Sequence, residues 1–223
     1  MVDETVKTRR TYDNRARAGQ ARRNRRRIVD AAHRLLLAQG YRATTMAGIA
    51  REAGVSVETV YKQFKTKAAL IKETYDVALA GDDEPIPLAD RPVYQALLAD
   101  PDPAGKLCRY AAVTRGISER TGPLMGVLLA AARSGGDPEL EAFAATTDRE
   151  RLIGATIIVG HLASSGALRP GLDQDRARDI VWSLISADVY RLLVVDRGWS
   201  LTAYETWLGE TLITTLTPSQ PQN

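Results

Sequence analysis

The stretch from Thr44 to Lys67 constrains this chain more than any other. It reads TTMAGIAREAGVSVETVYKQFKTK, in which two short helical patterns flank a Gly-Val-Ser turn. Gly54 permits the left-handed backbone that a tight turn requires. Thr45 and Ser56 stand where a hydroxyl can cap the helix that follows. The pattern predicts a helix-turn-helix whose second helix presents its first residues to base edges in the major groove of DNA.

The charge distribution also favours a polyanion-binding N-terminal region. Residues 1–70 hold 16 Lys and Arg against 6 Asp and Glu, a net of +10 within an overall charge of +3. The remaining residues are therefore acidic, with a net of −7. A basic first third joined to an acidic remainder indicates a nucleic-acid-binding region attached to a body with another task.

The rest of the chain predicts an all-α fold of about nine or ten helices, judged by apolar periodicity. The expected helices outside the helix-turn-helix cover residues 24–39, 67–80, 93–99, 104–120, 123–133, 137–165, 173–195 and 200–216. Residues 81–92 contain three prolines and predict a loop. The basic segment 1–21 has no apolar pattern, so we expect a flexible arm there, serving as a solubilising tail or lying along DNA.

One set of residues carries a family resemblance across residues 22–80. These are Ile28-x-x-Ala31-Ala32-x-x-Leu35-Leu36, Gly40-Tyr41, Thr44-Thr45, Ile49-Ala50-x-x-Ala53-Gly54-Val55-Ser56 and Thr59-Val60-Tyr61-x-x-Phe64-x-x-Lys67-x-x-Leu70. The pattern resembles the TetR family of bacterial transcriptional regulators. The resemblance implies a three-helix DNA-binding domain at residues 22–80 and a larger helical domain at residues 81–223 for ligand binding and dimerisation.

Candidate DNA contacts follow from the helix-turn-helix pattern and from the family resemblance. Val57, Glu58 and Thr59 open the second helix of the motif and are candidates for reading bases. Glu58 can accept from cytosine N4, or it can only stabilise the helix N-terminus. The resemblance implies phosphate contacts from Thr45, Tyr61 and Lys67. The full expected set is Thr44, Thr45, Val57, Glu58, Thr59, Tyr61, Lys62, Gln63 and Lys67, and the expected DNA arm is Arg15, Arg17, Arg22, Arg23, Arg25 and Arg26.

The body offers candidates for two further sites. By the resemblance, its middle helices enclose a ligand pocket, although ordinary core packing is the commoner role for residues of each of these types. The pocket candidates are Tyr110, Thr114, Met125, Leu128, Phe143, Ile157, His161 and Trp182. The last two helices are apolar over more than one face, which indicates a partner, and the family dimerises there. The dimer candidates are Leu184, Val189, Leu192, Tyr204, Trp207, Leu208 and Leu212.

These patterns predict a DNA-binding transcriptional regulator. More specifically, they predict a homodimeric repressor that binds a palindromic operator and is released from it by a small hydrophobic effector. An activator, or an effector-independent DNA binder of the same fold, is the alternative. A non-specific nucleic-acid binder and an enzyme are more remote, since no nucleophile elbow or phosphate loop occurs. We expect no cofactor, no catalytic residues and no metal. The apolar runs are too short to span a bilayer and the N-terminus lacks a secretory signal, which predicts a cytoplasmic protein.

Overall fold

A computed structural model describes residues 4–218, with side chains from residue 19 onward. These residues form ten α-helices, one 3-10 helix (η1) and one π-helix (η2), and this part of the chain contains no strand. The predicted all-α fold is therefore confirmed. No helix within residues 4–218 is long and apolar enough to cross a bilayer. Packing divides the chain into two compact units, Met1–Asp76 and Val77–Asn223, and the division falls within α4 (Lys67–Ala80).

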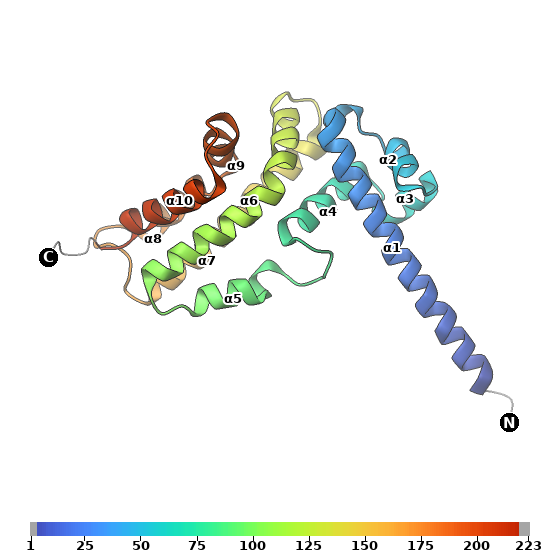
Figure 1. Ribbon diagram of the computed structural model, residues 1–223, viewed down its shortest axis with the longest axis horizontal. Helices are drawn as coiled ribbons and strands as arrows, with labels where there is room; N and C mark the ends of the chain where they lie inside the picture. The colour runs from blue at the N-terminus through green and yellow to red at the C-terminus, as the bar shows by residue number, and fades with distance from the viewer. Residues whose placement is uncertain (1–3, 219–223) are drawn as a thin grey trace. The chain divides into compact units, whose positions relative to one another are not determined.

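The first unit is built on α1 (Glu4–Ala43). Its C-terminal half packs beside α2 (Met46–Ala53), and α2 packs on α3 (Val57–Phe64); the N-terminal half extends past both (Figure 1). The core of this unit is apolar and almost inaccessible to solvent. Its most deeply buried side chains include Ile28, Ala31, Ala32, Leu36, Ile49, Val60 and Leu70.

The start of α1 corrects one expectation. We expected residues 1–21 to form a flexible arm and the first helix to begin near residue 24, whereas α1 begins at Glu4; residues 1–3 lie outside the described part. Residues 4–23 contain no proline and hold six arginines and three alanines, which are strong helix formers. Once the packed half of α1 is formed, adding further residues to it avoids the cost of a new helix nucleus.

The second unit is arranged around α6 (Pro103–Arg133). Four helices pack on it, and the contact with α10 (Leu201–Leu216) is the most extensive. The other three are α5 (Pro92–Ala99), α7 (Pro138–Ser164) and α9 (Ala187–Tyr190) (Figure 1). α8 (Gln174–Leu184) packs against α7. A single core cluster draws side chains from α5, α6, α7, α8, α9 and α10.

The loop between α4 and α5 is held by two arginines. Arg120 of α6 donates from Nε to the Ala78 carbonyl at 2.9 Å and from Nη2 to the Leu79 carbonyl at 2.8 Å. These carbonyls are among the last four of α4, which have no partner within the helix. Arg91 follows η1 (Leu88–Asp90) and binds both carboxylate oxygens of Asp82 at 2.6 and 2.8 Å. The expected loop at 81–92 is thus present and tied at both ends.

α6 is one helix, where we expected a break between residues 120 and 123. Pro123 lies inside it. A proline in a helix removes one hydrogen bond and leaves the carbonyl four residues earlier without its usual partner. That carbonyl belongs to Glu119, and both Glu119 and Pro123 are exposed, so water can take the place of the missing donor. Our expectation of a break was wrong because it did not take the solvent-facing position of Pro123 into account.

Gly122, next to this proline, is a point of close approach. A Cβ placed on Gly122 would lie 2.6 Å from Cε1 of Tyr190, a buried residue at the end of α9. The ring of Tyr190 also meets the ring of Tyr204 edge to face, at 5.4 Å between centroids. The aromatic contact between α9 and α10 therefore rests against bare backbone of α6.

The penultimate helix is also interrupted, whereas we expected one helix over residues 173–195. α8 ends at Leu184, and Ser186 then caps α9 by accepting from the Val189 amide at 3.2 Å. η2 (Arg191–Asp196) follows directly. Ser186 has extended backbone angles and uses its hydroxyl as a helix cap, a role that serine favours over helix interiors. Gly198 has φ +70, and Ser200 caps α10 as expected.

The Gly122 contact predicts a stability difference between two neighbouring glycines of α6. We expect Gly122→Ala to lower the free energy of unfolding by about 1–3 kcal/mol, because the added methyl overpacks against the Tyr190 ring. Gly126→Ala is the matched control, since nothing lies within 4 Å of a Cβ at that position. It should raise stability by about 0.5–1 kcal/mol through helix propensity. Urea denaturation of both variants measures this; equal effects would refute the contact.

Candidate nucleic-acid interface

α3 is held by hydrogen bonds at both ends. The Ser56 hydroxyl accepts from the Thr59 amide at 3.2 Å, as the sequence predicts. At the other end, Lys65 has φ +59 and its amide donates to the Tyr61 carbonyl at 2.9 Å. Val60 and Phe64 bury one face of α3 in the unit's core. The remaining faces of this eight-residue helix are left to solvent.

The solvent face of α3 carries exposed apolar and aromatic side chains. Val57 is 36% exposed and Tyr61 is 49% exposed. The Tyr61 hydroxyl has no hydrogen-bond partner within residues 19–218, and the exposed Lys62 has no ion pair there. A valine can contact a thymine methyl, whereas a phenol and an ammonium can each donate to a phosphate. This face combines the chemistry that groove recognition requires.

Glu58 and Thr59 are both drawn into the cap of α3. Hydrogen bonds from the Glu58 backbone amide and from the Ser56 side chain hold the pKa of the Glu58 carboxyl below its usual value. The carboxylate therefore remains ionised at the positive end of the helix. The Thr59 hydroxyl lies 3.0 Å from the Ser56 hydroxyl. The geometry supports the helix-stabilising alternative for Glu58.

Thr45 and Thr44 occupy different environments. Thr45 is exposed, and its Oγ1 accepts from the Gly48 amide at 3.0 Å, which confirms the predicted cap of α2 and leaves its own hydroxyl proton available. Thr44 is 1% exposed and donates to the Gly40 carbonyl at 2.8 Å. The structure thus places the Thr44 side chain in the core, where it cannot reach DNA.

Lys67 and Gln63 also point inward. The Lys67 ammonium donates to the Tyr41 carbonyl at 2.6 Å and lies 3.6 Å from the centroid of the Tyr41 ring. Lys67 therefore ties the start of α4 to the segment that follows the bend at Gly40 (φ +78). The Gln63 Oε1 atom is buried and has no hydrogen-bond partner among the described residues. The family resemblance implied a phosphate contact from Lys67 and did not indicate this packing role. Met46 is 7% exposed and belongs to the core.

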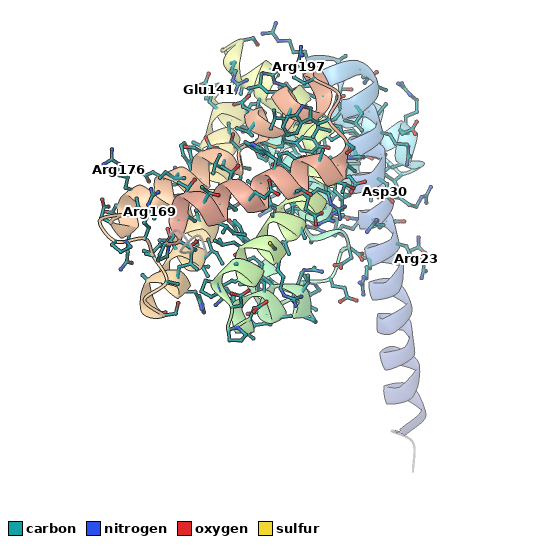
Figure 2. All side chains as sticks on the ribbon, turned by 60° about the vertical axis from the view of Figure 1, so that its left-hand side comes forward. Arg23, Asp30, Glu141, Arg169, Arg176 and Arg197 are labelled. Atoms are coloured by element: carbon teal, nitrogen blue, oxygen red, sulfur yellow. The ribbon has the colours of Figure 1, made fainter. Side chains whose placement is uncertain are left out.

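The cations of α1 differ in the partners that they bind. Arg25 binds Glu73 of α4 at 2.9 Å and lies 4.6 Å from the Phe64 ring centroid. Arg26 binds Asp30 at 3.0 Å, and Arg23 donates to Gln20 at 2.8 Å. Figure 2 shows Arg23 projecting away from the helix axis. Of the expected arm, Arg25 is thus part of the packing between α1 and α4, and Arg22 is exposed. The side chains of Arg15 and Arg17 lie outside the part of the chain that the structure describes.

Sequence reasoning missed three further cations of this unit. Arg27, Arg51 and Lys65 are exposed and form no ion pair within residues 19–218. All three belong to, or directly flank, the predicted helix-turn-helix and the helix packed on it. Their position near the motif was available from the sequence, but their lack of acidic partners depends on the fold.

The pocket candidates fall into two groups in the body. Tyr110 belongs to the core cluster, where burial raises the pKa of its hydroxyl, and Ile157 and Trp182 pack against the same cluster. Thr114, Met125, Leu128 and Phe143 are buried but are not members of that cluster, and His161 is half-buried. Trp182 Nε1 donates to the Asp148 carbonyl at 3.2 Å, and the Arg151 guanidinium covers its ring at 4.5 Å. Trp182 therefore bridges α8 to α7 at the protein surface.

The dimer candidates are divided by burial. Tyr204, Leu208 and Leu212 are fully buried in a single chain, so they form its core rather than a surface. Leu184, Val189 and Trp207 are half-buried. The exposed apolar residues of this region are instead Leu192 at 48%, Val195 at 65% and Trp199 at 36%. They lie along η2 and in the loop that leads to α10, where Arg197 is labelled in Figure 2.

Comparisons with known proteins agree with this geometry. The family described as "Bacterial regulatory proteins, tetR family" matches residues 28–74. An HTH-type transcriptional regulator of Bacillus subtilis, YvkB, is 49% identical over 47 residues, which are 21% of this chain and only a quarter of that protein. A second one, YdeS, is 29% identical over 168 residues, covering 75% of this chain and 77% of YdeS.

Solved structures share the fold over nearly their whole length. NalD of Pseudomonas aeruginosa, described as the secondary repressor of the MexAB-OprM multidrug efflux pump, is 20% identical with a TM-score of 0.67, covering 89% of this chain and 98% of NalD. FadR of Bacillus subtilis, solved in complex with stearoyl-CoA, is also 20% identical, with a TM-score of 0.67. The match covers 84% of this chain and 97% of FadR. The family match therefore places the helix-turn-helix domain, residues 28–74, among the bacterial regulatory proteins of the tetR family, and the chain shares its fold with the solved regulators.

Proposed function

We propose that this protein is a homodimeric repressor that binds a palindromic operator through α3 and is released by a small hydrophobic effector. The observation that carries the DNA-binding part is the exposed, unpaired face of α3. An eight-residue helix is only about 12 Å long, so one copy reads a few base pairs. A second copy, held one helical turn of DNA away, would supply the other half-site.

The proposed DNA contacts follow from where each side chain lies. Val57, with Thr59 beside it, faces the bases, and Glu58 sets the charge at the start of α3. Thr45, Tyr61 and Lys62 donate to phosphates, aided by Arg22 and Arg23 of the expected arm. The buried Thr44 and the half-buried Lys67 act indirectly, by holding the backbone around Gly40 and Tyr41.

The proposed dimer uses the apolar surface at the end of the body. Leu192, Val195 and Trp199 are exposed, and the half-buried Leu184, Val189 and Trp207 lie on neighbouring elements. Exposed apolar side chains that gather in one region are typical of a protein–protein contact surface. Trp199 meets Trp207 edge to face at 6.0 Å, so the two rings form a continuous apolar patch. A second copy is the occupant we propose, since a DNA dimer requires one.

The proposed effector binds within residues 81–223, among Tyr110, Thr114, Met125, Leu128 and Phe143, with Ile157 and His161 at the margin. The FadR fold accommodates stearoyl-CoA, and this chain has the same fold. A ligand that favours the DNA-free conformation lowers operator affinity only by its differential affinity for the two states. Activation, or regulation without an effector, remains the alternative.

The α3 proposal predicts opposite results for two lysines of the same unit. We expect Lys62→Ala to lower operator affinity and to reduce the slope of log K against log salt by about 0.9, the value for one lost phosphate contact. Lys72→Ala is the matched control, since Lys72 binds Asp76 at 2.6 Å, and it should leave both unchanged. Fluorescence anisotropy with a duplex selected by the wild-type protein measures this. Equal slopes for Lys62→Ala and wild type would contradict the contact.

The dimer proposal predicts that a charge on the apolar patch separates the protomers. Leu192→Asp should shift the protein from dimer to monomer in sedimentation equilibrium, because dimerisation would bury an unpaired carboxylate. Ile153→Asp is the control, since Ile153 is 60% exposed on α7, away from η2 and α10 in sequence. A Leu192→Asp protein that remains dimeric would contradict the proposed surface.

Effector control and the sign of regulation are tested together. A promoter carrying the selected operator should be repressed in a reporter assay, whereas increased expression would support the activator alternative. Apolar small molecules are then screened by DNA release, with thermal shift as the second readout. We expect at least one to raise the melting temperature and weaken operator binding. A screen in which no molecule weakens binding would count against effector control.

A further inference from the structure

One arginine of the first unit is held in a place that neither the family pattern nor the expected arm assigns to function. Arg27 lies on α1, immediately before the first core residue Ile28. A Cβ added to Gly54 would lie 2.7 Å from Arg27 Nη2 and 3.9 Å from Cζ. The guanidinium therefore rests directly over Gly54, in the turn between α2 and α3.

Glycine serves two purposes at this turn. Gly54 has φ +63 and ψ 42, the left-handed conformation in which its amide bonds the carbonyls of Ala50 and Arg51. Other residues adopt this conformation at a cost. Glycine also leaves the space that the guanidinium of Arg27 occupies, since any Cβ there would press on Nη2. The turn of the motif thus leaves room for the guanidinium of Arg27 beside it.

The guanidinium has no acidic partner in this position. Arg25 and Arg26 precede it on the same helix, and they are engaged by Glu73 and Asp30 respectively. Arg27 is exposed and forms neither an ion pair nor a hydrogen bond within residues 19–218. A guanidinium presents five N–H donors in a rigid fork that matches phosphate geometry.

The location of this unpaired group points to its ligand. Ser56, the cap of α3, follows Gly54 by two residues, and α3 begins at Val57. The end of α3 that would enter the groove is therefore adjacent in the chain to the turn that Arg27 covers. The start of a recognition helix lies in the groove between two phosphate backbones, so a cation beside it is placed to meet one of them.

We propose that Arg27 binds a backbone phosphate of the operator and so sets the register of α3 in the groove. This proposal rests on the proposed DNA binding through α3 and adds a contact from α1 that fixes position without reading sequence. The contact strengthens binding to any duplex on which α3 docks and leaves the preferred sequence unchanged.

The experiment is a salt titration of DNA binding by the full chain, using the operator duplex selected by the wild-type protein and a scrambled duplex of equal length. Arg27→Ala should reduce the slope of log K against log salt by about 0.9 on the operator. Raising the salt from about 50 to 200 mM would then weaken the wild type about 3.5-fold more than the variant. Arg27→Lys should retain the wild-type slope, because it keeps the charge.

Arg34→Ala is the matched control, since Arg34 lies on the same helix and already binds Glu52 at 3.0 Å. It should retain the wild-type slope. Arg27→Gln, a neutral side chain of similar length, replaces Arg27→Ala if the alanine variant does not fold, as judged by its melting temperature. A selection repeated with the Arg27 variant should return the wild-type operator sequence.

Three outcomes would overturn the proposal. The first is an unchanged slope in both neutral variants. The second is lower affinity with an unchanged slope and a lower melting temperature, which would show that Arg27 only stabilises the turn. The third is an altered preferred sequence, which would show a base contact. Failure of the proposed function itself looks different, because the wild-type protein would then bind the operator and scrambled duplexes equally.

Discussion

An eight-residue helix is not stable in isolation, and α3 exists because the rest of the first unit holds it. Helices shorter than about 12–15 residues are marginal in water even with favourable sequences. Val60 and Phe64 bury one side of α3, and Arg25 covers the Phe64 ring while binding Glu73 of α4. The Ser56 hydroxyl and the backbone bond from Lys65 close its two ends. What the helix can offer to DNA is therefore decided by residues that never reach DNA.

The same logic explains why arginines and lysines that look equivalent in sequence are not equivalent in the fold. Arg25, Arg26 and Arg34 are engaged by Glu73, Asp30 and Glu52, respectively. Exposed pairs of this kind add little stability, since the median is about 0–1 kcal/mol. Their main effect here is on availability, because a guanidinium bound to a carboxylate is less free to bind a phosphate. The unpaired charges then define a smaller electrostatic footprint than the net charge of +10 for residues 1–70 suggests.

Features that depend on local chemistry could be predicted from the sequence. The caps at Thr45 and Ser56 are confirmed, because the capping side chain and the amide it accepts from are three residues apart. The left-handed turn at Gly54 is confirmed because it too is set by local backbone chemistry. The helix-turn-helix was predictable because almost all of its determinants are local.

Features that depend on distant contacts could not be predicted. Thr44 and Lys67 read as surface residues of a DNA-binding motif, but both donate to carbonyls at the bend, at Gly40 and Tyr41. Tyr204 and Leu208 were predicted to contact a second protomer, but both are buried within one chain. The sequence does not show how much of α10 the long helix α6 covers. Whether Pro123 interrupts α6 depends on whether the proline faces solvent or the core. The apolar periodicity on either side of the proline does not show which.

The contact between Gly122 and Tyr190 has a consequence for how sequences of this kind can diverge. An aromatic ring at position 190 favours glycine at position 122, because a Cβ there would lie 2.6 Å from the ring. A lineage that gains a side chain at 122 must first, or simultaneously, accept a smaller residue at 190. In an alignment of close relatives, the two positions should therefore vary together although 68 residues separate them in the chain. Glycine would accompany tyrosine or phenylalanine, and alanine or serine would accompany aliphatic residues.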